Sequence, residues 1–553
     1  MARRFALLAT LASLVLPAAA GAATPVRFFP GTPVDGPSAD IQSLGDLDVA
    51  RDGTGALTYV KRVGGVDHVF LSRLVNGAFQ APEQVDAGLA GAGAQPVVAA
   101  SDGGRLVVAF VSGGGIFAAV RPAGAPGFAA LQPIAAAGTG TGRPKVAVAA
   151  DGVATVVWGE SGNVYARRLF ELRPSTAPQD VGENADAPDI SSEDDSSYAW
   201  VVFRPGGAVA RRLVGSQFDP PVTIQGNEGV DAPRVAINGR GVGYAGVGGA
   251  STLNAYGAVL KDDLFNPALM IGASVGAVPA AVPAAAETGD GLVAYQQGDA
   301  SGARSIHARP YDYVAASRAV TAPGPDATLS DPALGPTDAA RGLEAAADRA
   351  GDIAVAFVQG DGDTRRIVAG SYDRAPGAFR ASTTTKWRKF ARPPLKWGTA
   401  FELWGPLTYQ VQIDGQPVGA TTSTGLTVPT RVPDGLHRWR VVAIDIRGQA
   451  TATPTRNLRV DATPPKVSFK VSGSRKRGKQ VKVVAKATDA SGTAAKASGL
   501  VGVKISFGDG SRTFAGLRAA HRYGHSGKVT VRVSASDKAG NVVAVTRRIT
   551  IRK

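Results

Sequence analysis

Residues Pro144 to Leu172 read PKVAVAADGVATVVWGESGNVYARRLFEL, and this stretch decides how most of the chain is expected to fold. Its first segment alternates and ends at Asp151-Gly152, a pair that tolerates the positive φ of a tight hairpin. The nearly continuous apolar run ATVVWGE follows, as expected for a strand buried on both faces. A glycine-containing turn then leads to the more polar NVYARRL. The stretch therefore predicts three strands joined by tight turns.

The same pattern recurs through the first two thirds of the chain. Seven copies are present, and they surround or begin at Leu47, Pro96, Pro144, Pro188, Pro233, Pro283 and Leu343. The spacings between the five successive prolines are 48, 44, 45 and 50 residues. Several copies add a fourth strand introduced by Phe, such as FAALQPI and FNPALMI. Four strands in about 45 residues, repeated seven times, predict a seven-bladed β-propeller over residues 24–385.

Two segments beside the repeats carry expectations of their own. VRFFPG, from Val26 to Gly31, is expected to supply an outer strand that closes the ring with the last repeat. DAARGLEAAADRAG has a helix-forming composition, but its register with the other copies predicts a strand in its second half. The preceding residues, Thr321 to Arg341, are expected to form a long loop with a short helix.

The N-terminus has the pattern of a secretory signal peptide. Two arginines precede an apolar run from Phe5 to Leu16, and small residues follow, so cleavage is expected near residue 23. The run is too short to span a bilayer, and no later segment has about 18 consecutive apolar residues. We therefore expect a secreted monomer that has no transmembrane segment after cleavage. Association with the cell envelope is the other localisation considered.

Composition removes several kinds of chemistry. The chain has no cysteine, which excludes a thiol nucleophile, a CxxC redox site and a cysteine zinc site. The five histidines include one close pair, His521 and His525, which with Asp509 falls short of the four ligands of a zinc site. GASVG formally matches a nucleophile elbow at Ser274, but it lies in an all-β region. No catalytic residue, cofactor or metal is expected, and the Asp-rich EDDSS and GDGDT are interpreted as turns rather than calcium loops.

Charge is concentrated at the C-terminal end. Residues 466–553 hold 20 lysines and arginines and 3 acidic residues, a net charge of +17 in a chain whose total is +15. Within them, SGSRKRGKQVKVVAKATD is expected to bind a polyanion through Arg475, Lys476, Arg477, Lys479, Lys482 and Lys486. The partners considered are a cell-wall polymer, a polysaccharide or an extracellular protein, with nucleic acid bound only non-specifically. The alternative is a solvated face that aids solubility.

Two modules are expected after the repeats. In residues 393–461 the period-2 strands YQVQI and HRWRVVAI, the opening PPLKW and the exit VDATPP resemble immunoglobulin or fibronectin type III modules of bacteria. The last module, residues 462–553, contains FGDGS, HRY, VTVRV and SDKAGN in the order of the polycystic kidney disease (PKD) domain, which it resembles. The resemblance implies a second immunoglobulin-like β-sandwich. Its motif residues are Gly508, Asp509, Gly510, His521, Tyr523, Gly527, Asp537, Gly540 and Asn541.

Together these observations predict an all-β protein, a propeller followed by two immunoglobulin-like sandwiches. The function that fits best is non-catalytic binding at the cell exterior. The alternative is an extracellular carbohydrate-active enzyme with its site at the propeller mouth, for which two carboxylates would have to converge from distant repeats. The glutamates considered for such a pair are Glu171, Glu183, Glu228, Glu287 and Glu344.

Overall fold

The computed structural model describes residues 27–553 except 90, 139, 176, 194–195, 226–232, 250–253, 275–279, 384 and 490–496. The expected signal peptide, residues 1–23, lies outside the described residues. The described chain is all-β, and its helical elements are three short 3₁₀ turns: η1 (Pro332–Leu334), η2 (Ala339–Arg341) and η3 (Gly362–Thr364). Across the described ranges, no helix is long and apolar enough to cross a membrane.

Residues 28–372, called the ring below, form seven antiparallel sheets. The first contains β2 (Ile41–Val49), β3 (Gly55–Val63), β4 (Val66–Val75), β5 (Ala78–Phe79) and β6 (Glu83–Gln84). The second contains β7 (Gly93–Ser101), β8 (Arg105–Ser112), β9 (Gly115–Arg121) and β10 (Gln132–Ala135). The third contains β11 (Gly142–Val148), β12 (Ala154–Glu160), β13 (Asn163–Phe170), β14 (Arg173–Pro174) and β15 (Gln179–Gly182).

The remaining four sheets repeat this plan. The fourth contains β16 (Asp186–Ser192), β17 (Ala199–Arg204), β18 (Ala208–Val214), β19 (Gln217–Phe218) and β20 (Val222–Gln225). The fifth contains β21 (Arg234–Ile237), β22 (Gly243–Gly249), β23 (Asn254–Lys261), β24 (Leu264–Phe265) and β25 (Leu269–Ala273). The sixth contains β26 (Ala281–Ala285), β27 (Gly291–Gly298), β28 (Arg304–Tyr311) and β31 (Ala327–Thr328), with the side hairpin β29 (Tyr313–Val314) and β30 (Ala319–Val320). The seventh contains β32 (Leu343–Ala347), β33 (Ile353–Gln359), β34 (Arg366–Tyr372) and β1 (Phe28–Asp35).

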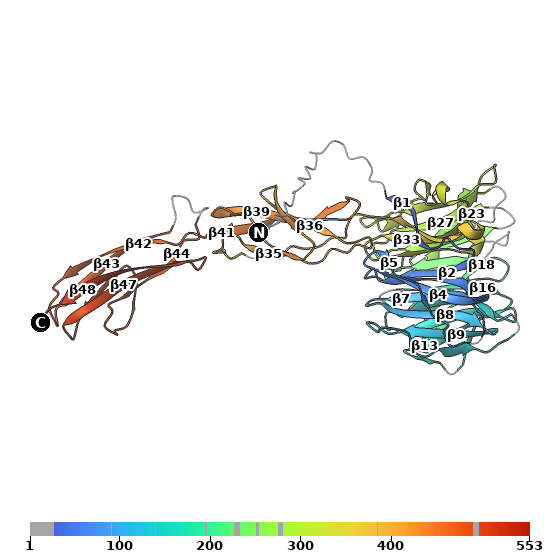
Figure 1. Ribbon diagram of the computed structural model, residues 1–553, viewed down its shortest axis with the longest axis horizontal. Coiled ribbons are helices and arrows are strands. Elements are labelled where there is room, and N and C mark those ends of the chain that lie inside the picture. The colour runs from blue at the N-terminus through green and yellow to red at the C-terminus, as the bar shows by residue number, and fades with distance from the viewer. Residues whose placement is uncertain are drawn as a thin grey trace, which may run out of the picture.

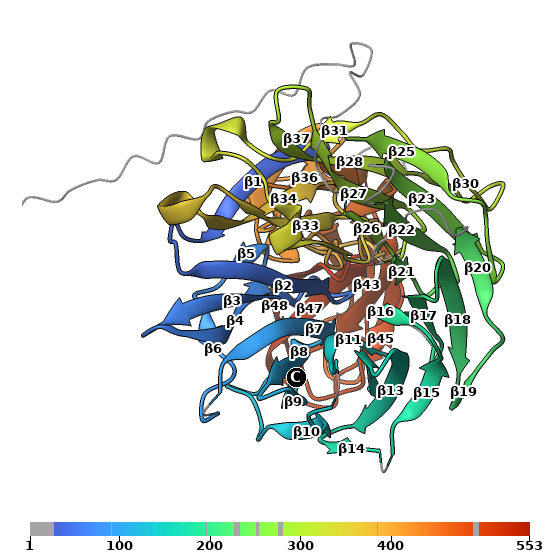
Figure 2. The ribbon, with the colours of Figure 1, turned by 90° about the vertical axis from the view of Figure 1, so that its right-hand side faces the viewer.

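The sheets follow one another in a circle (Figure 2). The first strand of each sheet contacts the first strand of the next, in the order β2, β7, β11, β16, β21, β26 and β32, and β32 contacts β2. The N-terminal strand β1 pairs with β34, as expected from VRFFPG, so the seventh sheet is built from both ends of the ring's sequence. The segment from Thr321 to Arg341, expected as a long loop with a short helix, contains the 3₁₀ turns η1 and η2 and also the two-residue strand β31, which pairs with β28. The expected strand after it is confirmed, because β32 begins at Leu343.

Side chains on the first strands fasten neighbouring sheets together. Asp48 accepts a hydrogen bond from the backbone N–H of Ala100 at 2.7 Å, and Asp189 accepts one from Val235 at 2.9 Å. Each bond crosses from one sheet to the next and satisfies an N–H group that faces away from its own partner strand. Apolar clusters fill the space between adjacent sheets, with the central strands such as β33 buried along their whole length.

Two smaller two-sheet modules follow the ring (Figure 1). The middle module has one sheet of β35 (Pro394–Lys396) and β38 (Gly425–Thr427), and another of β36 (Thr408–Ile413), β37 (Gln416–Thr421), β39 (Gly435–Ile444), β40 (Ala450–Ala452) and β41 (Arg456–Val460). The C-terminal module has a three-stranded sheet of β42 (Lys466–Gly473), β43 (Gln480–Thr488) and β46 (Arg518–Arg522). Its second sheet contains β44 (Leu500–Ser506), β45 (Phe514–Ala515), β47 (Gly527–Asp537) and β48 (Val542–Ile551). Each module has its own apolar core between its sheets.

The middle module is attached to one face of the ring. Leu403 and Trp404, in the segment before β36, belong to the apolar core shared by the first and seventh sheets. The backbone N–H of Leu403 donates to Asp352, at the turn between β32 and β33, over 3.0 Å. The other face of the ring points away from both modules (Figure 1).

Candidate functional site

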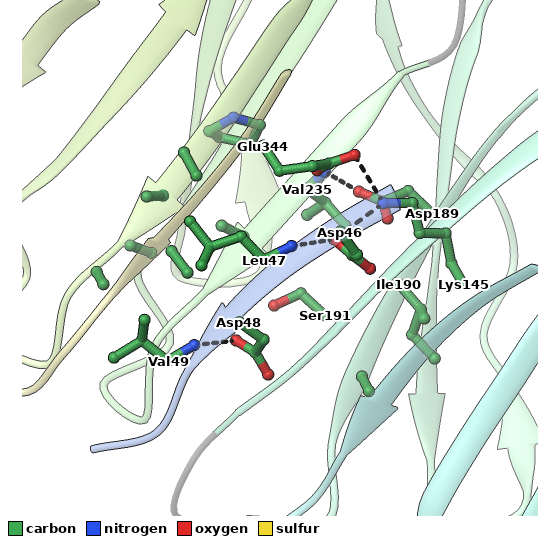
Figure 3. Close-up of a pocket in the computed structure, with 18 of the residues that line it drawn as sticks. Asp46, Leu47, Asp48, Val49, Lys145, Asp189, Ile190, Ser191, Val235 and Glu344 are labelled. Atoms are coloured by element: carbon green, nitrogen blue, oxygen red, sulfur yellow. Dashed lines mark hydrogen bonds and ion pairs between the residues drawn. The ribbon is translucent and has the colours of Figure 1, made fainter. Parts of the chain in front are cut away.

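Five charged side chains meet at the centre of the ring, each from the first strand of a different sheet: Asp46, Lys145, Asp189, Arg234 and Glu344. All of them except Arg234 are labelled in Figure 3. The Nζ of Lys145 lies 3.3 Å from Oδ1 of Asp46 and 3.1 Å from Oε1 of Glu344. Arg234 donates through Nη2 to the same oxygen of Glu344 at 3.2 Å, and its Nη1 lies 3.7 Å from Asp189. The result is one continuous ionic layer across the channel.

Burial sets the ionisation of this layer. It raises the pKa of Asp46 to about 7, against the opposing effect of Lys145. Burial lowers the pKa of Lys145, but the surrounding carboxylates outweigh it, so the pKa ends above its ordinary value and the ammonium stays charged. Nearby Asp48 also has its pKa raised by burial, to about 6, although two backbone N–H groups favour its charged form.

The ionic layer separates two chambers of opposite character. The smaller, about 120 Å³, is lined by the later halves of the first strands and contains Asp46, Asp48, Asp189 and Glu344 with Lys145. The larger, about 540 Å³, is lined by the beginnings of these strands and contains Arg143, Lys145, Arg204, Arg234 and Arg341, with Glu344 the single carboxylate among its described lining residues. It opens on the face that points away from the two modules.

Carboxylates behind the larger chamber hold its arginines in place. Asp186 binds Arg204 through two hydrogen bonds of 3.0 Å, and Asp338 lies 3.1 Å from Nε of Arg341. Because Asp186 and Asp338 do not line the chamber, its described wall holds five cations and one carboxylate, Glu344. The arrangement favours an anionic group in the larger chamber.

Of the five glutamates considered from the sequence, Glu344 lies at the ring's centre. Glu171 and Glu183 are exposed, Glu287 accepts the backbone N–H of Gly239 at 3.0 Å, and Glu228 lies outside the described residues. Ser274 of the GASVG match accepts a hydrogen bond from the backbone N–H of Gly298 at 2.8 Å, and the rest of that motif is partly outside the described residues.

The other members of the layer were missed from the sequence, although a signal exists. Lys145, Asp189 and Arg234 each directly follow the proline that opens a repeat, and Glu344 follows Leu343 in the same register. Charged residues at one register position of a buried strand indicate that the position faces a common centre. Asp46 has no such proline before it.

The six basic residues named from the sequence divide into two groups. Arg475, Lys476, Arg477 and Lys479 lie in the exposed turn between β42 and β43, whereas Lys482 and Lys486 project from β43 itself. Residues of β43 alternate between exposed and buried, which places both lysines on the outer face of the sheet.

Neighbouring strands extend that outer face. The exposed positions of β42 and β46 add Lys466, Lys470, Arg518 and Arg522. We call the six cations Lys466, Lys470, Lys482, Lys486, Arg518 and Arg522 the basic face. Four of them were missed from the sequence. Arg518 and Arg522 come from β46, about 30 residues after β43, whereas the alternation in KVSFK of the preceding strand β42 already indicated Lys466 and Lys470.

The residues of the PKD-like motif form turns of the C-terminal module and hydrogen bonds that hold its backbone in place. His521 lies in β46, and its Nε2 contacts Oδ2 of Asp509 over 2.6 Å. Tyr523 is buried and donates through its hydroxyl to the carbonyl of Phe507 at 3.1 Å. Gly508 has a φ of +77°, and a Cβ there would collide with the carbonyl of Thr530.

The remaining motif residues form a second turn and a strand start. Asn541 donates through its backbone N–H to Asp537 at 2.8 Å and through its side chain to the carbonyl of Asp461 at 2.7 Å. Gly540 and Gly527 both have positive φ. Asp537 also belongs to a group of three carboxylates with Asp461 and Asp489, whose oxygens lie within 4.8 Å of one another.

Comparisons with known proteins give weak likenesses. No family model matches the chain, and no curated protein matches it. The PKD1 domain of Vibrio anguillarum Epp is 19% identical, with 16% of this chain and 95% of that chain covered and a TM-score of 0.14. The fibronectin(III)-like modules of Clostridium thermocellum CbhA are 13% identical, covering 32% and 93%, with a TM-score of 0.21. A fungal alcohol oxidase of the AA5 family in complex with copper is 10% identical, covering 95% and 99%, with a TM-score of 0.39. None of these similarities assigns an activity to this chain.

Proposed function

We propose that the chain is an exported, non-catalytic binding protein that attaches to anionic polymers through its C-terminal module. In this proposal the ring is a seven-bladed β-propeller and the two modules are immunoglobulin-like, the last of them a PKD domain. One observation carries the function: the basic face holds six exposed cations on three strands, and no acidic residue lies among the exposed positions of those strands.

The spacing within the basic face suits a repeating ligand. Each strand contributes two cations four residues apart, which is about 13 Å along a strand. The cations of β43 are offset from those of its neighbours, since Lys470 and Arg518 both pair with Val484, between Lys482 and Lys486. The offset keeps like charges from lying directly opposite one another. A polymer with regularly spaced anionic groups could contact several cations at once, whereas a single small anion could not.

The experiment measures binding of the full-length chain to fluorescent polygalacturonate. The test variant changes Lys466, Lys470, Lys482 and Lys486 to Gln. The control changes four exposed cations on the outer face of the other sheet, Lys504, Lys528, Arg532 and Arg548, to Gln. The test variant should lose at least about tenfold in affinity at low salt, and wild-type binding should weaken steeply with salt.

The control variant has the same net charge as the test variant, so it separates the basic face from the charge of the whole module. A loss confined to the test variant supports the proposal. Equal losses in both variants, or binding that salt does not weaken, would contradict it.

A carbohydrate-active enzyme at the ring mouth is the second candidate. It is favoured by the 540 Å³ chamber and by the pKa of Asp46 near 7, a range suited to a general acid. Against it, the oxygens of Asp46 accept from the backbone of Leu47 and Val98 as well as from Lys145. Reducing-sugar release from acidic polysaccharides by the wild type, lost in Asp46→Asn, would establish the enzyme.

A further inference from the structure

A second set of carboxylates is buried where the ring meets the middle module. Asp352 precedes β33 and Asp373 follows β34, so both belong to the ring, while Glu402 lies in the segment leading to β36. One carboxylate oxygen of each lies within 4.8 Å of the other two. Asp445, which follows β39 of the middle module, acts electrostatically on both Asp373 and Glu402. We call Asp352, Asp373, Glu402 and Asp445 the junction cluster.

Three oxygens of the junction cluster are buried without a hydrogen-bond partner. Asp373 is fully buried, and its Oδ2 pairs with Nη1 of Arg447 at 2.7 Å, but its Oδ1 has no partner. Oε1 of Glu402 accepts from the backbone N–H of Trp404 at 3.0 Å, while Oε2 has none. Oδ1 of Asp445 accepts from two backbone N–H groups, and Oδ2 has none. A buried charged oxygen without a partner is costly, so three together indicate a missing positive partner.

The protein supplies little positive charge of its own to these groups. Within the described residues the junction cluster forms one ion pair with a basic side chain, between Asp373 and Arg447. Arg374, next in sequence to Asp373, instead pairs with Asp290 of the sixth sheet. Asp352 uses its two oxygens to accept from the backbone N–H groups of Arg374 and Leu403, and within the described part of the chain it forms no ion pair with a lysine or an arginine.

We propose that the junction cluster binds a calcium ion, with Asp352, Asp373 and Glu402 as carboxylate ligands. All available donors are oxygens, which is the preference of this hard cation. Calcium–oxygen distances of about 2.3–2.6 Å require two ligands of one ion to lie within about 5 Å of each other, and the three carboxylates meet this condition. Asp445 acts electrostatically on Asp373 and Glu402, and its partnerless Oδ2 would bind the same ion directly or through a water.

The ion would join two parts of the chain. Two of its ligands belong to the ring and one to the segment that enters the middle module, beside the Leu403 and Trp404 contact. Binding would therefore add a polar tie to an apolar contact and fix the middle module on the ring. Because the ion binds the assembled junction and not the unfolded chain, it should stabilise that arrangement.

The test is calcium titration of the full-length chain by isothermal titration calorimetry after dialysis against a chelator. Wild type should bind calcium with a dissociation constant of about 0.1–1 mM or tighter, and magnesium more weakly. Glu402→Gln should lose at least about 10- to 100-fold in affinity for this site. The same variant should melt at a higher temperature than wild type in chelator, because the Gln amide can donate to a partnerless oxygen and one negative charge is removed.

The melting temperature in chelator shows whether Glu402→Gln is folded, so a loss of calcium binding caused by misfolding can be recognised. Asp489→Asn is the matched control, because it removes one carboxylate from the other three-carboxylate group, with Asp461 and Asp537. It should retain the binding event that Glu402→Gln loses. The proposal is overturned if wild type shows no calcium binding, or if Glu402→Gln binds calcium as wild type does.

Discussion

The centre of the ring and the junction cluster are built from the same residue types with different charge balance. At the centre, Lys145 lies between Asp46 and Glu344, and Arg234 completes the layer. At the junction, the carboxylates outnumber the one arginine that pairs with them, and three oxygens are without partners. Where the chain itself supplies cations to buried carboxylates, the carboxylates help to hold the fold together. Where it supplies too few cations, as at the junction, the carboxylates form a candidate cation-binding site.

The largest expected effect is at the ring centre. Lys145→Met should lower the free energy of unfolding by about 3–5 kcal/mol, because it leaves Asp46 and Glu344 buried without their shared cation. Denaturant unfolding of the full-length chain measures this loss. Lys479→Met, in the exposed turn of the C-terminal module, is the control and should leave unfolding unchanged. A loss as small as that of the control would mean that the layer does not hold the ring together.

At the junction the matching change is Arg447→Met. Nη1 and Nη2 of Arg447 donate to Asp373 and to Ser371, each at 2.7 Å, so its removal leaves a further buried oxygen unsatisfied. In chelator the loss of stability should be about 2–3 kcal/mol. In millimolar calcium it should shrink to less than half, because the ion compensates the charge of Asp373. An identical loss in both conditions would remove the distinction between the two regions.

The strands of both regions could be predicted from the sequence, whereas their charge relationships could not. The apolar runs and Asp-Gly or Asn-Gly turns are local signals, and they placed β12, β33 and the seven repeats. Even the outer strand β1 followed from a short segment beside the repeats. The alternation of exposed and buried residues in β43 was likewise local and correctly assigned Lys482 and Lys486 to one face.

The ionic layer and the junction cluster depend on closure of the ring and on docking of the next module. Asp46 and Glu344 are almost 300 residues apart in the chain and meet because β2 contacts β32. Asp352 and Asp445 stand at hairpins, where aspartate is common for backbone reasons, so nothing in the local sequence marks them as part of a shared site. Which of their oxygens remain without partners depends on the docked geometry.

The smallest of the three expected effects is a pH dependence of stability caused by Asp48. The pKa of Asp48, near the ring centre, is raised by burial from 3.8 to about 6. Between these values the folded chain holds a proton that the unfolded chain has released, so the contribution of Asp48 to stability is greatest below pH 4 and falls as pH rises through 6. Asp48→Asn should remove this fall, about 1 kcal/mol after allowance for the part of the side chain that remains solvated.

Melting temperatures of wild type and Asp48→Asn from pH 4 to pH 7, recorded in chelator, measure that difference. The Asn keeps one acceptor for the N–H groups of Val49 and Ala100, so the variant should fold with some loss at low pH and approach wild type near neutrality. Parallel pH profiles would mean that the channel is more hydrated at Asp48 than its surroundings indicate. Converging profiles would mean that burying Asp48 destabilises the folded ring near neutral pH. At Asp48 the carboxylate is then stabilised by two backbone N–H groups, whereas the carboxylates of the ionic layer pair with cations. Three oxygens of the junction cluster have neither kind of partner.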